Sequence, residues 1–225
     1  MSITLAFDVY GTLIDTTGIT TTLEKYVGEQ ARSFSRLWRD KQLEYSFRRG
    51  LMQNYHDFSI CTKNALDYAC TFFRTEIGER EKAELMEGYR MLPTFPDVEE
   101  GLENLKSAGF RMFAFSNGRE EDVSALLRNA TIDTYFDGVV SVDEIKSFKP
   151  NPAVYCHFLR RSGSTGSEAW LISSNPFDVI GAISAGMRAA WIRRTADIIF
   201  DPWDIEPTIT VSGIGGLQNA IRDAQ

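Results

Sequence analysis

The chain has 225 residues, enough for one sizeable hydrophobic core or for a core with a modest second unit. Its net charge of -7 excludes general binding of nucleic acid or of an anionic membrane, although a local basic pocket for a small anion remains compatible. Two histidines and three cysteines without a CxxC pair argue against a zinc site, so we expect reduced thiols in a cytoplasmic protein.

The predicted elements start with a strand at residues 3–7 that ends at Asp8 and is followed by a turn at Gly11-Thr12. From about residue 20 to residue 90 apolar residues recur at helical spacing, and no strand is indicated. After residue 97 helices and strands alternate. The strands are expected at residues 111–115, 139–141, 169–172, 189–192 and 208–211, and the helices at residues 97–108, 120–128, 151–161 and 176–185, with a short helix at the end.

This alternation predicts an α/β protein with a Rossmann-like parallel sheet that helices cover on both faces. The helical stretch interrupts the pattern directly after the first strand. We therefore expect a core domain that begins with residues 1–14 and resumes at residues 97–225, with an inserted α-helical cap domain at residues 15–96.

Polar residues follow several of the predicted strands. Asp8 ends the first strand, Ser116-Asn117-Gly118 ends the second, and Ser173-Ser174-Asn175 ends a later one, with Asp178 one helical turn beyond. Lys149 precedes a proline, which favours an extended backbone. Ligands bind at the carboxyl ends of strands in open parallel sheets, so we expect these residues to meet in one site.

Four short segments carry a specific resemblance. Asp8-Val9-Tyr10-Gly11-Thr12-Leu13 resembles the first motif of the haloacid dehalogenase superfamily, and Phe115-Ser116-Asn117-Gly118 resembles its second motif. Lys149-Pro150 and Ser174-Asn175-Pro176-Phe177-Asp178 resemble the third and fourth motifs, in the expected order. One such segment alone is a weak signal, whereas four in order, with an inserted helical stretch, make chance implausible.

Two positions depart from the magnesium phosphatases of that superfamily. Tyr10 stands where those enzymes have an acidic residue that protonates the leaving group, and Ser174 replaces one of two carboxylates that help to hold magnesium. Both departures resemble the L-2-haloacid dehalogenase branch, as does the segment of residues 37–45 with its Arg39. This resemblance implies a metal-independent hydrolase without a cofactor, which acts on small-molecule 2-haloacids and releases halide. It also implies a homodimer.

The resemblance assigns a role to each candidate residue. Asp8 is the nucleophile that forms an ester with the substrate, and Asp178 positions or deprotonates the water that hydrolyses this ester. The remaining catalytic candidates orient or balance these groups, and they are Thr12, Arg39, Ser116, Lys149, Tyr155, Ser173 and Asn175. The candidates for contact with the alkyl group or the halide are Tyr10, Leu43, Phe58, Asn117 and Phe177.

Less specific interpretations remain open for several of these residues. Arg39 fits a solvent-exposed helix position, and Leu43 and Phe58 fit ordinary core packing. Ser, Asn and Asp after strands also serve as caps and turn formers. Two other functions stay possible at this point: a magnesium-dependent small-molecule phosphatase with an unusual site, and a non-catalytic binding protein that shares the fold.

Overall fold

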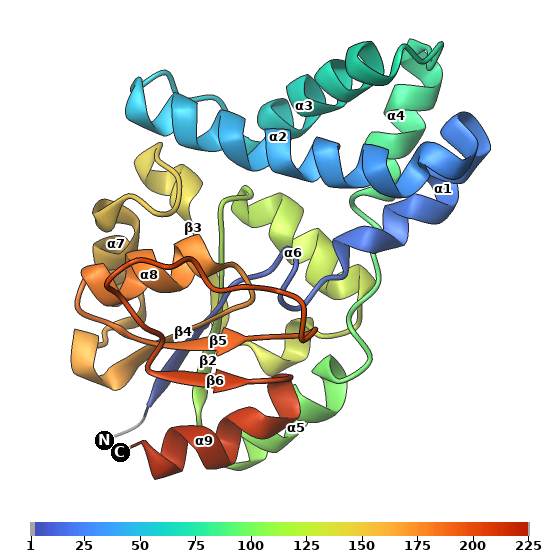
Figure 1. Ribbon diagram of the computed structural model, residues 1–225. Coiled ribbons are helices and arrows are strands. Elements are labelled where there is room, and N and C mark those ends of the chain that lie inside the picture. The colour runs from blue at the N-terminus through green and yellow to red at the C-terminus, as the bar shows by residue number, and fades with distance from the viewer. Residues whose placement is uncertain (1–2, 225) are drawn as a thin grey trace.

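The computed structural model describes residues 3–224 and is built on a six-stranded parallel sheet (Figure 1). The strand order is β3-β2-β1-β4-β5-β6, so the first strand lies in the middle and the chain winds outward in both directions. The strands are β1 (Thr4–Phe7), β2 (Arg111–Ser116), β3 (Gly138–Ser141), β4 (Ala169–Ser173), β5 (Arg188–Ile192) and β6 (Ile209–Val211).

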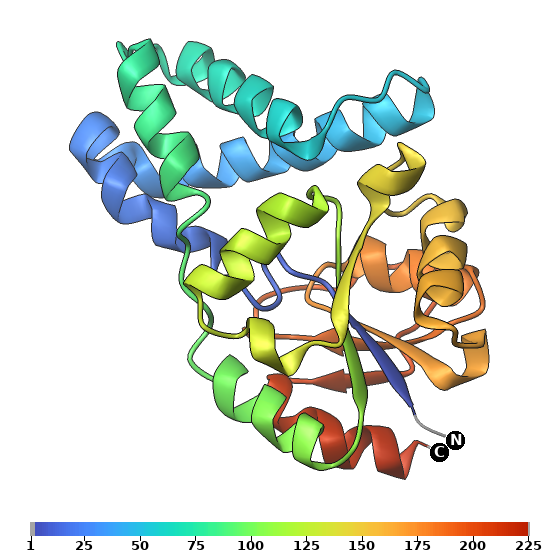
Figure 2. The ribbon, with the colours of Figure 1, turned by 180° about the vertical axis from the view of Figure 1, so that it is seen from behind.

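Helices cover both faces of this sheet (Figures 1 and 2). Alternate residues of a strand point to opposite faces. Accordingly, Leu5 and Phe7 of β1 pack in a different hydrophobic cluster from Ala6. The first cluster includes residues of α5 (Val98–Ser107), α6 (Glu120–Asn129) and α9 (Leu217–Asp223), and the second includes residues of α7 (Pro152–Ser162) and α8 (Pro176–Ser184). Burial on both faces explains why most residues of the central strands are apolar.

The predicted helical stretch forms a separate layer over the carboxyl ends of the strands (Figure 1). Its helices are α1 (Thr20–Val27), α2 (Ala31–Leu51), α3 (Phe58–Phe73) and α4 (Glu79–Gly88). Phe34 and Trp38 are buried on one side of α2, and the same side continues with the buried polar residues Gln42 and Ser46. The internal face of α2 therefore changes from apolar to polar halfway along the helix, at the level of Arg39.

Two chain segments join the helical layer to the sheet, and they pair with each other. The backbone N–H of Asp15 donates to the carbonyl of Pro93 at 2.8 Å, and the N–H of Phe95 donates to the carbonyl of Leu13 at 3.1 Å. Because both connections run side by side, the helical layer is attached at one place, next to the end of β1.

The expected order of helices and strands is confirmed, with bounds that differ by one or two residues. The predicted capping of α7 is also present, because the Asn151 side chain accepts a hydrogen bond from the N–H of Ala153 at 2.9 Å. Short 3-10 helices in the connections, such as Thr16–Ile19 and Val142–Ile145, were not predicted. Among residues 3–224, no helix combines the length and the apolar character that a membrane crossing requires.

Candidate active site

Segments that are distant in the sequence meet at the carboxyl ends of the central strands. Asp8 directly follows β1, Ser116 ends β2, and Ser173 ends β4. Since β1 pairs in parallel with both β2 and β4, these three residues come together at one edge. Lys149 arrives from the loop before α7, where its backbone N–H donates to the Asn117 Oδ1 atom at 2.9 Å.

The two carboxylate oxygens of Asp8 have different surroundings. Three donors converge on Oδ2: the Thr12 hydroxyl at 2.9 Å, the Ser173 hydroxyl at 3.3 Å and the Asn175 amide nitrogen at 2.7 Å. Oδ1 accepts one hydrogen bond, from Lys149 Nζ at 3.1 Å. A carboxylate oxygen accepts about two hydrogen bonds, so Oδ1 retains a free lone pair whereas Oδ2 is saturated.

The ammonium group of Lys149 lies between two carboxylates. Its Nζ donates to Asp178 Oδ2 at 2.8 Å, to Asp8 Oδ1 at 3.1 Å and to the Phe115 carbonyl at 2.9 Å, while the residue is only 1% exposed. Burial alone would lower the pKa of Lys149, but the charges of Asp178 and Asp8 outweigh this effect and raise it. Lys149 therefore stays protonated and balances one of the two negative charges.

Asp178 is completely buried behind this lysine. Its Oδ1 atom accepts a hydrogen bond from the Tyr155 hydroxyl at 2.8 Å, and its Oδ2 atom accepts from Lys149. Burial raises the pKa of Asp178 to about 6, against the opposing attraction of Lys149. The close approach of Tyr155 requires a glycine on α8, since a Cβ atom at Gly181 would collide with the tyrosine hydroxyl.

Arg39 reaches the site from α2 in the helical layer. Its Nη2 atom donates to the Tyr10 carbonyl at 3.2 Å, and its Nη1 atom donates to Gln42 Oε1 at 2.6 Å. Gln42 is itself held in place, because it accepts from the Tyr89 hydroxyl at 3.3 Å and donates to the Thr62 hydroxyl at 2.5 Å. We did not predict Gln42 from the sequence, and its only signal was a polar residue at helical spacing after the apolar residues Phe34 and Trp38.

A small cavity of about 10 Å³ lies where these groups meet. That is about the space that one water molecule needs. All of its lining residues belong to the set predicted from the sequence: Asp8, Tyr10, Arg39, Leu43, Phe58, Ser116, Asn117, Lys149, Asn175 and Phe177. The four other predicted residues do not line it: Thr12 and Ser173 donate to Asp8, Tyr155 donates to Asp178, and Asp178 accepts from Lys149.

Aromatic and aliphatic side chains close the cavity on the side of the helical layer. The rings of Tyr10 and Phe58 lie 6.0 Å apart, and the ring of Phe177 meets Phe47 edge-on at 5.0 Å. Leu43 lies on α2 one turn from Arg39. Burial raises the pKa of Tyr10 far above its usual range, so its hydroxyl is a weak acid at neutral pH. The cavity thus combines one carboxylate, cationic groups and an apolar wall.

One further residue that supports the site was missed by the sequence analysis. Arg194 follows β5, and its Nη2 atom donates to the Thr12 carbonyl at 2.5 Å while its Nη1 atom donates to Asp97 Oδ1 at 2.7 Å. It thereby ties the turn after Asp8 to the start of α5. An arginine after a strand carries no distinguishing pattern in the sequence, because most arginines lie on the surface.

Comparison with known proteins agrees with this geometry. A family model described as haloacid dehalogenase-like hydrolase matches residues 4–186, and the chain therefore belongs to that family. Two relatives are haloacetate dehalogenase H-2 of Moraxella sp. (strain B), 35% identical over 96% of both chains, and (S)-2-haloacid dehalogenase 4A of Burkholderia cepacia. The latter is 38% identical over 84% of this chain and 81% of its own length.

Solved structures agree as well. L-2-haloacid dehalogenase from Xanthobacter autotrophicus superimposes with a TM-score of 0.93 at 30% identity and covers 99% of both chains. A second structure of that enzyme, with chloropropionic acid covalently bound, gives the same score, identity and coverage. The similarity therefore includes the helical layer as well as the sheet.

The side chains at this edge of the sheet do not fit a magnesium ion of the kind that the phosphatases of the superfamily hold. Asp8 and Asp178 both pair with the ammonium of Lys149, at 3.1 Å and 2.8 Å. Ser174 contributes a neutral hydroxyl where those enzymes have a second acid. Magnesium is held mainly through carboxylate oxygens, so the neutral Ser174 leaves such a site short of one anionic ligand.

Proposed function

We propose that this protein is an (S)-2-haloacid dehalogenase that hydrolyses short-chain L-2-haloalkanoic acids to D-2-hydroxyacids through an aspartyl ester, without a metal ion. The observation that carries the proposal is the asymmetry at Asp8, which lines the cavity: three donors saturate Oδ2, whereas Oδ1 accepts from Lys149 alone and keeps a free lone pair. The family and the names of the relatives support the same reaction.

In the first step, Oδ1 of Asp8 attacks C2 of the substrate from the side opposite the halogen. The new O–C2 bond forms as the carbon–halogen bond breaks, and the halide leaves with the bonding electrons, so the configuration at C2 inverts. Halide departure needs no proton, which is consistent with a neutral Tyr10 in place of an acid. The bound chloropropionic acid in the Xanthobacter autotrophicus enzyme supports such an adduct.

Positive charge and donors must surround two reacting anions. Arg39 supplies a guanidinium at the cavity and stabilises the departing halide together with Asn117 and the edge of the Phe177 ring. With Asn117 Oδ1 accepting from the Lys149 backbone, the amide nitrogen of Asn117 remains as a donor for the halide. Ser116 and the backbone amides near it hold the substrate carboxylate.

In the second step, water attacks the carbonyl carbon of the Asp8 ester. Oδ2 then carries the developing negative charge, and the Thr12, Ser173 and Asn175 donors are already directed at it. Collapse of this intermediate breaks the bond between the Asp8 carboxyl carbon and Oδ1. The 2-hydroxyacid leaves with Oδ1 on C2, and the water oxygen completes the restored carboxylate. The products are the hydroxyacid, the halide and one proton.

Asp178 is our proposed base for this water. Its pKa of about 6 suits proton transfer near neutral pH, and the partners of its two oxygens, Tyr155 and Lys149, fix its orientation. Asp178 does not line the cavity, and Lys149 Nζ links it to Asp8, so we place the water that it activates on the Lys149 side of Asp8. The attraction of Lys149 favours the ionised form of Asp178 before the proton transfer.

We further propose that residues 15–96 act as a cap domain on a core of residues 1–14 and 97–225. The helical layer supplies Arg39 and Leu43 from α2 and Phe58 from α3, whereas the nucleophile belongs to the sheet. Attachment at a single paired linker is compatible with opening of the cap, which a cavity of about 10 Å³ requires before an acid can bind.

Two proposals concern the protein in the cell. A homodimer is supported by exposed apolar side chains on the helical layer, such as Phe72 and Leu51, which are 61% and 86% exposed. A cytoplasmic location is supported by three cysteines that form no disulfide. Sedimentation analysis over a range of concentrations tests the dimer, and a monomer throughout would refute it.

Halide release from L- and D-2-chloropropionate in EDTA tests the function, beside a magnesium-dependent phosphatase assay and an Asp8→Asn variant. We expect chloride from the L acid only, unaffected by EDTA and abolished in the variant. Phosphate release that depends on magnesium, without chloride release, would instead support the phosphatase alternative. An Asp8→Asn variant that keeps its function would point to the non-catalytic binding protein.

A further inference from the structure

A second and much larger cavity adjoins the reaction cavity. Its volume is about 570 Å³, and it shares two lining residues, Lys149 and Phe177, with the cavity at Asp8. It lies between one face of α2 and one face of α8. Its inner wall is apolar, since it includes the buried side chains of Phe148 and Ile180.

One continuous apolar ridge on α2 connects the two cavities. Leu43 lines the reaction cavity, and Phe47, one turn later on the same face, lines the large cavity together with Gly50 and Leu51. An alkyl chain attached to C2 beside Leu43 would therefore meet apolar surface along its whole course toward the large cavity. No polar group on this ridge has to be desolvated along the way.

Phe177 lines both cavities. Most other side chains around the reaction cavity are fixed by hydrogen bonds, including those of Asp8, Arg39 and Lys149. Phe177 is half-buried, lies at the start of α8, and contacts Phe47 through a single edge-on ring contact. It also has a cavity of about 570 Å³ beside it, so its ring has space to turn without displacing the core.

We propose that the large cavity binds the alkyl tail of 2-haloacids longer than halopropionate, and that Phe177 is the residue that sets how far the tail extends. The inference rests on the proposed dehalogenase function and names a broader class of substrate for the same site. The reacting head group stays at Asp8, and the tail passes Phe177 along the α2 ridge.

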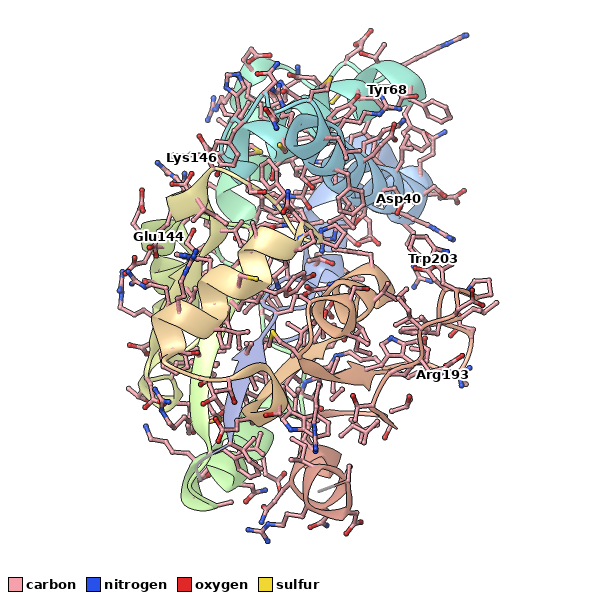
Figure 3. The ribbon with its side chains drawn as sticks, turned by 90° about the vertical axis from the view of Figure 1, so that its left-hand side faces the viewer. Asp40, Tyr68, Glu144, Lys146, Arg193 and Trp203 are labelled. Atoms are coloured by element: carbon pink, nitrogen blue, oxygen red, sulfur yellow. The ribbon has the colours of Figure 1, made fainter. Side chains whose placement is uncertain are left out.

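The chemistry of the cavity favours an alkyl tail over a polar ligand. Of the two charged residues that line it, Lys149 has its ammonium engaged with Asp8 and Asp178, and Asp201 would repel a second anion. The outer rim is open and includes large exposed apolar side chains, with Leu51 86% exposed and Trp203 65% exposed. Figure 3 shows Trp203 in the loop at the outer edge of the core, below the helical layer.

Burial of one methylene group contributes about 0.8 kcal/mol, which corresponds to about a fourfold change in affinity. The three additional methylene groups of (S)-2-bromohexanoate relative to (S)-2-bromopropionate thus allow up to about a 60-fold gain. We expect the KM for bromide release to be at least tenfold lower for the hexanoate. Inhibition by the unhalogenated acids measures binding without turnover. We expect hexanoate to inhibit competitively with a Ki at least tenfold below that of propionate.

A filling variant tests where the tail lies. Gly50→Leu adds bulk inside the large cavity, and a Cβ atom there makes only ordinary contact, 3.8 Å from the Phe148 ring. Gly215→Leu is the matched control, because nothing lies within 4 Å of its Cβ position and it is remote from the cavity. We expect Gly50→Leu to lower the hexanoate-to-propionate ratio of kcat/KM at least tenfold and Gly215→Leu to leave it unchanged.

Further variants keep the inference testable if Gly50→Leu does not fold. Ser184→Leu adds bulk from the opposite wall and should lower the same ratio, whereas Phe177→Leu should raise it by widening the passage. Wild-type protein that releases bromide from the propionate, but has no lower KM or Ki for the longer acids, overturns the inference and leaves the proposed function intact. The same holds if the filling variants do not change the ratio. Absence of bromide release from the propionate refutes the proposed function itself.

Discussion

Replacement of Lys149 by methionine tests the electrostatic design of the site. Methionine keeps much of the volume of the lysine but removes the ammonium that lies 3.1 Å from Asp8 and 2.8 Å from Asp178. Both carboxyl groups stay where they are, 8% and 0% exposed. Removal of one partner from a buried ion pair leaves an uncompensated charge and costs about 3–5 kcal/mol of the free energy of unfolding.

The cost should depend on pH in a defined direction. The pKa of Asp178 is about 6 in the wild-type protein, and it rises further once the attraction of Lys149 is lost. A carboxyl group whose pKa is raised in the folded state binds a proton that the unfolded chain has released. Stability is therefore lost as pH rises from the unfolded pKa through the folded one. The pKa of Lys149 is raised above its usual value of 10.5 in the folded wild type. Its contribution to the free energy of unfolding is therefore constant at any pH below 10.5.

Urea unfolding followed by circular dichroism at pH 8 and pH 5.5 measures both effects. We expect Lys149→Met to lose about 3–5 kcal/mol at pH 8, and about 2 kcal/mol less than that at pH 5.5. Lys146→Met, which removes an exposed lysine paired with Asp143, is the matched control and should change stability by less than about 0.5 kcal/mol. The double variant Lys149→Met/Asp178→Asn should recover most of the loss. A Lys149→Met protein as stable as the wild type at pH 8 would refute the reasoning.

Three other predictions concern catalysis. Because Asp178 must be ionised to accept a proton, kcat should fall about tenfold per pH unit below about 6, and a flat profile to pH 5 would exclude it as the base. Gln42→Leu frees Arg39 Nη1 and should lower kcat about tenfold with a loss of about 1–3 kcal/mol in urea unfolding, whereas unchanged kcat would show that Gln42 only supports the fold. Asn175→Ala removes the 2.7 Å donor to Asp8 Oδ2 and should slow ester hydrolysis more than ester formation. Intact-mass spectrometry should then detect the acid bound to Asp8, and slow turnover without this adduct would contradict the assignment.

Local patterns in the sequence were sufficient to predict the fold, and the resemblance to a known family supplied the groups that line the reaction cavity. Apolar strands that end in Asp8, Ser116 and Ser173 indicate a parallel sheet, and parallel strands bring their carboxyl ends to one edge. Tyr10 and Ser174 favoured a dehalogenase over a phosphatase, because neutral side chains stand where the phosphatases have acidic ones with defined roles in their reaction. These features are local, so the order of residues along the chain is enough to recognise them.

Only the tertiary structure placed the groups that act from a distance. Gln42 supports Arg39 through contacts with Thr62 and Tyr89, which come from other helices, and helical periodicity identifies a buried face but not its partners. Asp178 lies behind Lys149 and outside the reaction cavity, and a sequence motif does not predict this position either. The large cavity exists because α2 and α8 approach each other without filling the space between them. Such a gap depends on the packing of whole elements, and no single segment of the sequence encodes it.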